Sequence, residues 1–305
     1  MSDIDTSRQS PAWMRQKERG SSFLLSIMCI LSARLGRSGS RVVLYGIALY
    51  FVLFARKARR ASRTYLEHCL SRPVTWRDQY KHVLAFASTI HDRLYLLRDK
   101  FDAFEISVSG ETELHRHYES GQGLLLFGAH LGSFEVLRTL ARDRPGLALS
   151  MALYPKNARQ INRALATINP GAKLDFIELG TIDAMLAVND KLKSGGLVSI
   201  LADRASGPDQ YLSLPFLGEP ARFPTGPFRM AAMLGHPVYF ITGLYEGGNR
   251  YQLHFELLED WAGYTRKDRD AFIEATMVKY VALLERYCRT HPYNWFNFYQ
   301  FWEEN

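Results

Sequence analysis

The sequence predicts an α/β fold in which a mostly parallel central sheet is flanked by helices and preceded by an N-terminal hydrophobic and amphipathic helical arm. From Gly123 onward, short apolar runs alternate with segments of helical periodicity, which is typical of parallel sheets. Before that point the chain is basic and apolar. With 305 residues, 47% of them hydrophobic and 23% charged, the chain can bury a core, so disordered, collagen-like and coiled-coil classes are excluded.

Short apolar runs with turn signals around them predict the strands. These are residues 124–127, 147–153, 174–177, 197–201, 238–244 and 251–258, the last two forming a hairpin around Glu246–Asn249. Helices are predicted over residues 76–97, 134–142, 158–168, 182–193, 228–234 and 269–289. No internal repeat interrupts this order, so we divide the chain into an arm, residues 1–72, and an α/β domain, residues 73–305.

The basic charge lies almost wholly in the arm. Residues 1–63 contain 12 Lys/Arg and 3 Asp/Glu, a net charge of +9, and the remainder of the chain sums to −2. This distribution argues against a nucleic-acid-binding body and favours an arm that meets an anionic membrane surface.

Two apolar runs in the arm, residues 23–30 and 42–55, are each short for a membrane span. Directly after them comes a basic cluster, Arg56, Lys57, Arg59, Arg60 and Arg63. This cluster would lie at the cytoplasmic headgroups, whether the arm is peripheral or crosses the bilayer once. A pair of core helices in a soluble protein is the alternative. A signal peptide fits less well, because arginines follow the first run where a cleavage site would stand.

The three cysteines, Cys29, Cys69 and Cys288, are widely spaced and form no CxxC pair. The sequence therefore predicts neither a disulfide scaffold nor a cysteine zinc site. Instead it predicts that the protein lies in a reducing compartment. We expect no metal site.

The first candidate site follows the strand at residues 124–127, where a turn contains His130 and a helix starts near Ser133. Glu135 in the first helical turn would accept a hydrogen bond from one ring nitrogen of His130, leaving the other to take a proton. Gly132 would let substrate approach the backbone. The alternative is a turn histidine, with Glu135 complementing the helix dipole. Ser133 fits an N-cap better than a nucleophile, because the GxSxG elbow is absent.

The second candidate site follows the strand at residues 197–201. Asp203 and Arg204 end this strand, and a fixed arginine here would bind a phosphate in a forked geometry, unless the pair only closes a loop. Further along, Arg222 would lie beside a helix start that Thr225 caps.

Four motifs occur in an order that resembles a known family. They are HLGSFE at 130–135, LADR at 201–204, PFLGEPARFPTGP at 215–227 and HPYNWFNF at 291–298. Together they resemble the bacterial lipid A biosynthesis acyltransferases of the lauroyl and myristoyl type, within the lysophospholipid acyltransferase superfamily. The resemblance covers nearly the whole chain.

The resemblance implies transfer of a fatty acyl group from acyl carrier protein or acyl-coenzyme A to a hydroxyl or amine of a membrane lipid or glycolipid. It also implies the cytoplasmic face of a bacterial inner membrane and a catalytic pair at His130 and Glu135. The acyl thioester is a co-substrate, and no other cofactor is expected. We expect substrate to contact Gly132, Asp203, Arg204, Arg222 and Thr225.

In the expected mechanism His130 deprotonates the acceptor, and backbone N–H groups near Gly132 or a nearby side chain hold the oxyanion. Two other functions remain open. A thioesterase or lysolipid hydrolase would use water at the same pair, and a non-catalytic lipid-binding assembly protein would keep only the fold. The presence of both His130 and Glu135 favours an enzyme.

Overall fold

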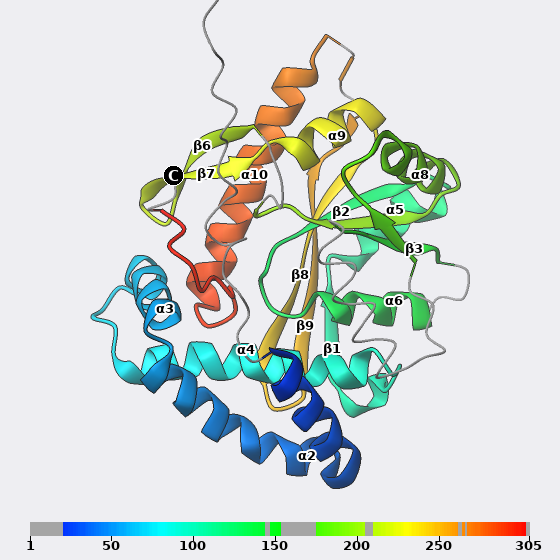
Figure 1. The fold of residues 1–305 in the computed structure, drawn as a ribbon. Helices are drawn as coiled ribbons and strands as arrows, with labels where there is room; N and C mark the ends of the chain where they lie inside the picture. Colours follow the sequence, from blue (N-terminus) through cyan, green and yellow to red (C-terminus); the bar gives the residue numbers. More distant parts are fainter. Residues whose placement is uncertain are drawn as a thin grey trace, which may run out of the picture.

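A seven-stranded sheet forms the centre of the chain, with strand order β1-β9-β8-β2-β5-β3-β4 (Figure 1). The computed structural model describes residues 21–143, 147–153, 175–204, 210–261, 264–265 and 267–302, with only the backbone for 21–31, 33, 141 and 143. β8 (Val238–Gly247), β2 (Leu124–Gly128), β5 (Leu197–Leu201), β3 (Leu149–Leu153) and β4 (Phe176–Glu178) run parallel. β9 (Arg250–Glu259) and β1 (Glu105–Ser109) run the opposite way. The predicted mostly parallel sheet is confirmed.

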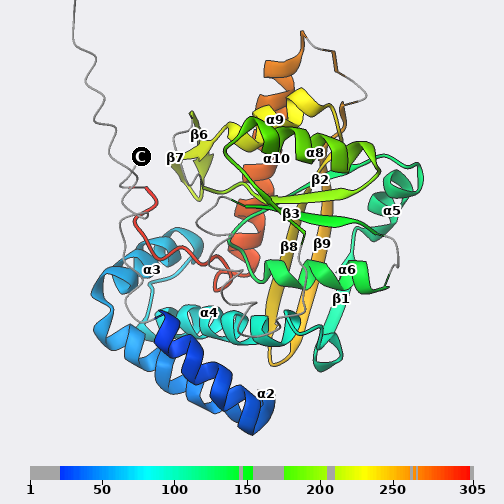
Figure 2. The same cartoon turned by 45° about the vertical axis from the view of Figure 1, so that its right-hand side comes forward.

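Both faces of the sheet are covered by helices, which explains why its central strands β8, β2, β5 and β3 are mostly apolar and buried. Leu125 and Phe127 of β2 pack with α8 (Ile182–Lys193), α9 (Gly226–Leu234) and α10 (Arg269–Thr290). Leu124 and Leu126 point to the other face, toward α5 (Glu111–Glu119), the 3-10 helix η2 (Phe134–Leu137) and α6 (Arg138–Asp143). Figure 2 shows α8 and α6 on opposite sides of the strands.

Among the elements that were not predicted are the helix α5 and three strands. β1 is an edge strand, and β6 (Tyr211–Phe216) pairs with β7 (Glu219–Pro224) as a separate antiparallel hairpin. The 215–227 segment contains four prolines, and proline is typical of loops, so the sequence did not indicate a hairpin here. The structure can hold these prolines in strands because proline is tolerated at the edges of a sheet. The predicted helix at 134–142 begins instead as the 3-10 turn η2. The helix expected at 158–168 lies outside the described residues.

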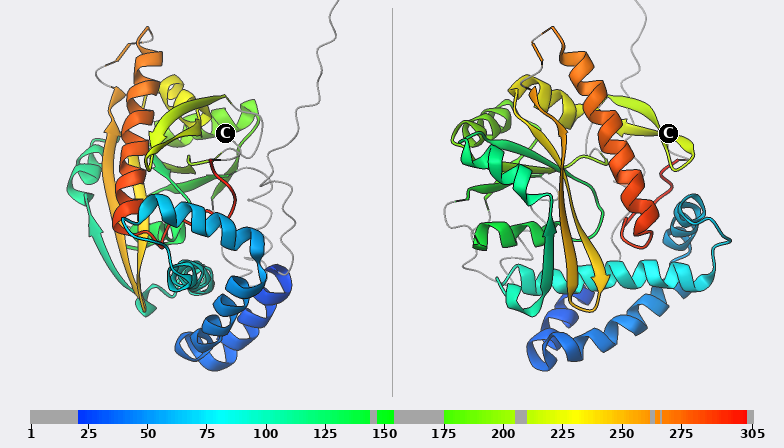
Figure 3. Two further views of the ribbon diagram at one scale, coloured as in Figure 1. Left: turned by 90° about the vertical axis from the view of Figure 1, so that its left-hand side faces the viewer. Right: turned by 180° about the vertical axis from the view of Figure 1, so that it is seen from behind.

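The arm packs against the body. α2 (Ser21–Phe54) breaks at Gly36, whose φ of 65° suits glycine, and α3 (Arg56–Cys69) follows directly. Leu44, Ala48 and Val52 of α2 are buried against α4 (Trp76–Leu96), at the lower end of the molecule in Figure 3. The outer face of α2 is apolar and exposed; it consists of Leu35, Val42, Tyr45, Leu49, Tyr50, Leu53 and Phe54. Residues 34–54 are long and apolar enough to cross a membrane by length and composition.

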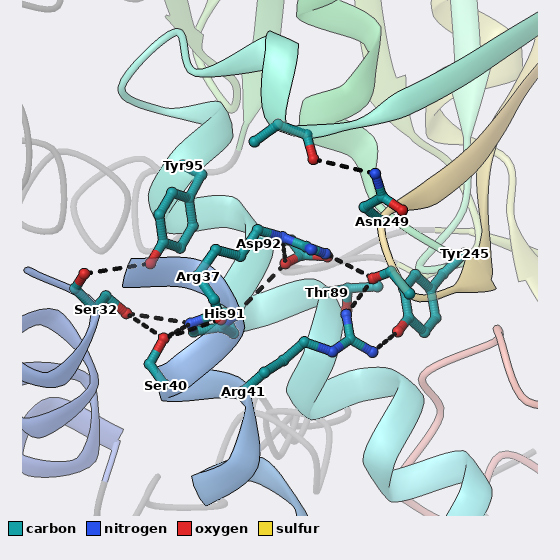
Figure 4. Close-up of polar contacts among 12 residues, drawn as sticks. Ser32, Arg37, Ser40, Arg41, Thr89, His91, Asp92, Tyr95, Tyr245 and Asn249 are labelled. Atoms are coloured by element: carbon teal, nitrogen blue, oxygen red, sulfur yellow. Dashed lines mark hydrogen bonds and ion pairs between the residues drawn. The ribbon is translucent and has the colours of Figure 1, made fainter. Parts of the chain in front are cut away.

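A buried ion pair ties α2 to the body (Figure 4). The Arg37 guanidinium donates to both carboxylate oxygens of Asp92 on α4, at 2.9 Å each, and Tyr251 of β9 donates to the same carboxylate at 2.8 Å. Both Arg37 and Arg41 donate to the carbonyl of Gly248 in the β8–β9 turn. These hydrogen bonds fix the position of α2 on the domain.

His82 joins α3, α4 and the C-terminal segment. Its side chain is fully buried, with Nδ1 2.8 Å from the Ser62 hydroxyl and Nε2 2.8 Å from the Trp295 carbonyl. Burial lowers the pKa of His82 to about 4, against the opposing effect of the hydrogen bond to Trp295. The His82 ring of the folded protein is therefore neutral at pH 7.

We expect the free energy of unfolding to fall as the pH drops from about 6.5, where the unfolded His82 begins to bind a proton, to about 4, where the folded one does. The titration of His82 alone should lower the free energy of unfolding by about 3 kcal/mol over this pH range. His82→Gln, which cannot titrate, should be less stable at pH 7 but lose less stability on acidification. Denaturant unfolding in mild detergent at several pH values measures both, with His115→Ala as the control, because His115 is a half-buried histidine of α5. Equal pH dependence of native and His82→Gln proteins would contradict this assignment.

Candidate functional site

His130 and Asp203 come from neighbouring parallel strands. β2 ends at Gly128 and pairs with β5, which ends at Leu201, so the two following turns lie side by side at the carboxyl edge of the sheet. The Nδ1–H of His130 donates to Asp203 Oδ1 at 2.8 Å, and the backbone N–H of His130 donates to Asp203 Oδ2 at 3.1 Å. This pairing assigns the proton to Nδ1, which leaves Nε2 as the basic nitrogen.

The electrostatics of this pair suit a general base. Burial and the nearby Arg204 lower the pKa of His130 below 6.5, while Asp203 acts in the opposite direction. Burial by itself would raise the pKa of Asp203, but the facing His130 and Arg204 hold it below its usual value of 3.8. The carboxylate is therefore ionised and the imidazole neutral at pH 7. The His130 side chain is 31% exposed, so substrate can reach it, whereas Asp203 is inaccessible.

Glu135 does not take the place that we expected beside the His130 ring. Its carboxylate, 5% exposed, lies 2.6 Å from Nε of Arg93 on α4 and accepts a hydrogen bond from the Ser133 hydroxyl at 3.2 Å. The physical reason is that residue 135 lies in the 3-10 turn η2, which packs against α4, whereas residue 203 arrives from the adjacent strand. Asp203, and not Glu135, makes the hydrogen bond to the His130 ring in this structure.

The backbone N–H groups at Gly132 and Ser133 are already used. Gly132 N–H donates to the Asn294 carbonyl at 2.8 Å, and Ser133 N–H donates to the Gly243 carbonyl at 2.7 Å. At Gly132, φ is 72° and a Cβ atom would lie 2.0 Å from the Gly243 oxygen, so only glycine fits. These two N–H groups already have acceptors and are not free to hold an oxyanion, so the expected alternative, a nearby side chain, stays a prediction. Ser133 is at the N-cap position but does not cap with its side chain, which is bound to Glu135.

The remaining expected binding residues lie in different places. Arg204 is close to the pair, with Nη2 3.6 Å from Asp203 Oδ2 and its guanidinium 5.1 Å from the centre of the Tyr299 ring. Arg222 lies on β7, exposed, with its guanidinium over the Tyr211 ring. Thr225 precedes α9 as its N-cap residue but makes no side-chain cap hydrogen bond. The structure thus joins Arg204, but neither of the other two, directly to Asp203.

Two residues of the site were not among our candidates. Arg93 holds Glu135 and, by its charge, lowers the pKa of His130. Trp295 donates its indole N–H to Asp203. The polar residues Asn294 and Asn297 among aromatic ones in the 291–298 segment were the available signal for a buried hydrogen-bonded segment. Nothing in the local pattern of α4 distinguished Arg93 from a surface arginine. Within the described ranges, no group of three or more His, Cys, Asp or Glu residues is arranged to hold a metal ion.

Nearly the whole chain matches the model of a protein family. No curated protein matches the sequence. The model of the bacterial lipid A biosynthesis acyltransferases matches residues 12–304, which include every residue of the site described above. The sequence therefore belongs to the bacterial lipid A biosynthesis acyltransferase family, and the protein is an acyltransferase.

Proposed function

We propose that the protein transfers a fatty acyl group from acyl carrier protein or coenzyme A to a hydroxyl or amine of a membrane lipid or glycolipid. The family supports acyl transfer in general. The observation that carries the reaction type is the buried Asp203 carboxylate, which binds Nδ1–H of His130 and leaves Nε2 of a partly exposed ring as base.

The steps require only residues of this chain and the two substrates. His130 Nε2 takes the proton of the acceptor hydroxyl or amine as the acceptor attacks the thioester carbonyl. The tetrahedral intermediate then collapses, the C–S bond breaks, and the imidazolium returns the proton to the departing sulfur. Asp203 stabilises the imidazolium. No metal or further cofactor is required, because the thioester itself is the activated acyl donor.

We assign recognition of anionic groups to arginines around the ring. Arg204 and Arg93 both act on the His130 ring by their positive charge. A guanidinium in this position binds a phosphate of the donor or acceptor, or the oxyanion that Gly132 cannot hold. Glu135 keeps Arg93 in place. The exposed Arg222 of β7 and the half-buried Thr225, which precedes α9, would contact the more distant parts of a large substrate.

We infer that residues 1–72 attach the domain, residues 73–305, to the cytoplasmic face of the inner membrane. The buried face of α2 is occupied by α4, so the exposed apolar face defined above is the one available to lipid. In α3 the cluster Arg56, Lys57, Arg59, Arg60 and Arg63 is exposed next to it. An apolar row beside basic side chains is typical of helices that lie in the membrane interface.

Changing the five basic residues of the cluster to Gln should weaken binding to anionic vesicles by about 100-fold or more at low salt, and to neutral vesicles little. Each basic side chain near an anionic surface contributes about 1 kcal/mol, which salt screens. Leu49→Glu with Leu53→Glu should release the protein from both vesicle types. Vesicle co-sedimentation measures the binding.

The matched control changes five exposed basic residues of the domain, Arg116, Lys193, Arg229, Lys267 and Lys279, to Gln. This variant loses the same net charge as the cluster variant, and it should bind anionic vesicles as tightly as the native protein does. Equal losses in the two five-residue variants would assign the effect to net charge and contradict a docking surface on α2 and α3.

The proposed function is tested with the full-length protein in detergent. Fatty acyl thioesters of coenzyme A and of acyl carrier protein are supplied with lipid extracted from a strain that lacks the gene. We expect thiol release that requires the lipid extract, and a lipid heavier by one acyl group in the mass spectrum. Release of free fatty acid at the same rate without the extract would show a thioesterase. No turnover with any thioester would favour a lipid-binding protein.

A further inference from the structure

The segment after α10 runs along the turn that contains His130. Gly132 N–H donates to the Asn294 carbonyl and Phe296 N–H donates to the His130 carbonyl, both at 2.8 Å. Leu131 and Trp295 form an antiparallel bridge between these two bonds. The two segments are thus paired as a short two-stranded ladder, although about 160 residues separate them.

The Trp295 side chain extends from this ladder to Asp203. The indole Nε1–H donates to Asp203 Oδ2 at 3.2 Å, on the oxygen that also accepts the His130 backbone N–H at 3.1 Å. The other oxygen, Oδ1, accepts the ring Nδ1–H of His130 at 2.8 Å. With donors on both oxygens, the carboxylate cannot rotate without breaking a hydrogen bond to an ionised group, which is worth more than a neutral one.

Trp295 is itself held firmly from several elements. The residue is fully buried, its carbonyl lies 2.8 Å from Nε2 of His82 on α4, and its ring makes edge contacts with Tyr65 of α3 and Phe216 of β6 at 5.0 and 5.3 Å between centroids. Phe301 packs against the same ring at 5.0 Å. An indole fixed in this way can transmit its position to the carboxylate.

We propose that Trp295 is a positioning residue for the acyl transfer proposed above: its indole N–H holds the Asp203 carboxylate in the orientation that binds the His130 ring. Trp295 acts through Asp203, because its hydrogen bond is to that residue and Asp203 makes the contact with the ring. The inference rests on the proposed function of His130 as the base.

The expected consequence has a defined sign. The charged or titratable groups that face the His130–Asp203 pair are Arg93 from α4, Arg204 from the turn after β5, and Tyr280 and Cys288 from α10. None of these changes when Trp295 is replaced. Loss of the indole N–H removes a donor from the carboxylate, whose negative charge then acts more strongly on the ring. The pKa of His130 should rise, and the acid limb of kcat/KM should move to higher pH.

The experiment compares native protein and Trp295→Phe over a range of pH, with the thioester and lipid extract of the assay above. We expect kcat to fall by about 10-fold, the KM for the thioester to stay unchanged, and the acid limb to shift upward by about 0.5 unit. Phe301→Leu is the matched control. It removes part of a buried ring that touches Trp295, so it should lower stability and leave the acid limb unmoved.

A double-mutant cycle with Asp203→Asn separates positioning from general packing. If Trp295 acts through the carboxylate, Trp295→Phe should have little further effect on kcat/KM in the Asp203→Asn background. An equal loss in both backgrounds, or an unmoved acid limb, would overturn the inference. If Trp295→Phe does not fold, benzothienylalanine at position 295 keeps the ring shape and removes only the N–H.

His130→Ala, measured alongside, distinguishes this inference from the proposed function. Turnover by His130→Ala at the native rate would overturn the function and this inference with it. If His130→Ala is inactive while Trp295→Phe has native kinetics and a native pH profile, the function stands and only the role of Trp295 is wrong.

Discussion

His130→Ala should lower kcat/KM for acyl transfer by about 10²-fold or more, because the imidazole is the proposed general base of the reaction. The fold should survive, since the side chain is 31% exposed and its backbone carbonyl, which accepts from Phe296, is kept. Thiol release from the acyl thioester, measured with the lipid extract present, gives the rate. Thermal unfolding and vesicle binding show whether the protein is otherwise intact.

His115→Ala is the matched control for this variant. His115 is on α5, where it pairs with Glu119 at 2.8 Å on the surface, so its loss should leave turnover unchanged. The native protein should keep its activity below pH 6.5, because burial and Arg204 lower the pKa of His130 and the ring stays neutral there. Near-native turnover by a folded His130→Ala protein would refute the mechanism.

Asp203→Asn should be almost as damaging, with a loss in kcat/KM on the order of 10²-fold or more. The amide cannot stabilise an imidazolium, and its NH₂ group favours the wrong tautomer of the ring. Glu135→Gln should lose at least about 10-fold less. The amide oxygen still accepts from Ser133, and the contact that it weakens is to Arg93, which is 37% exposed.

The two carboxylate variants decide which residue assists His130. They are compared in the same assay, with thermal unfolding as the control for folding, because both side chains are buried. A nearly inactive Glu135→Gln beside an active Asp203→Asn would show that Glu135 acts on the ring during turnover and would refute the assignment to Asp203.

The sequence by itself determined the fold class and most of the helices and strands of the α/β domain. β2, β5 and β8 are buried on both faces and read as continuous apolar runs, while α4, α8 and α10 show helical periodicity, so each was recognisable without its neighbours. The β8–β9 hairpin was equally local, because Gly247 and Gly248 adopt positive φ at its turn. The order of the four motifs was sufficient to indicate the family. The match of the family model over residues 12–304 shows the same family.

The tertiary structure decided which residues surround His130. Sequence distance favoured Glu135, five residues away, but a ring nitrogen bonds to whatever the sheet places beside it. The β2–β5 pairing brings Asp203 to that position from 73 residues away. Arg93 and Trp295 reach the same site from α4 and from the C-terminal segment. Strand periodicity and helix periodicity are local properties of the chain, whereas hydrogen-bond partners across a sheet edge depend on strand order and register, which no local pattern contains.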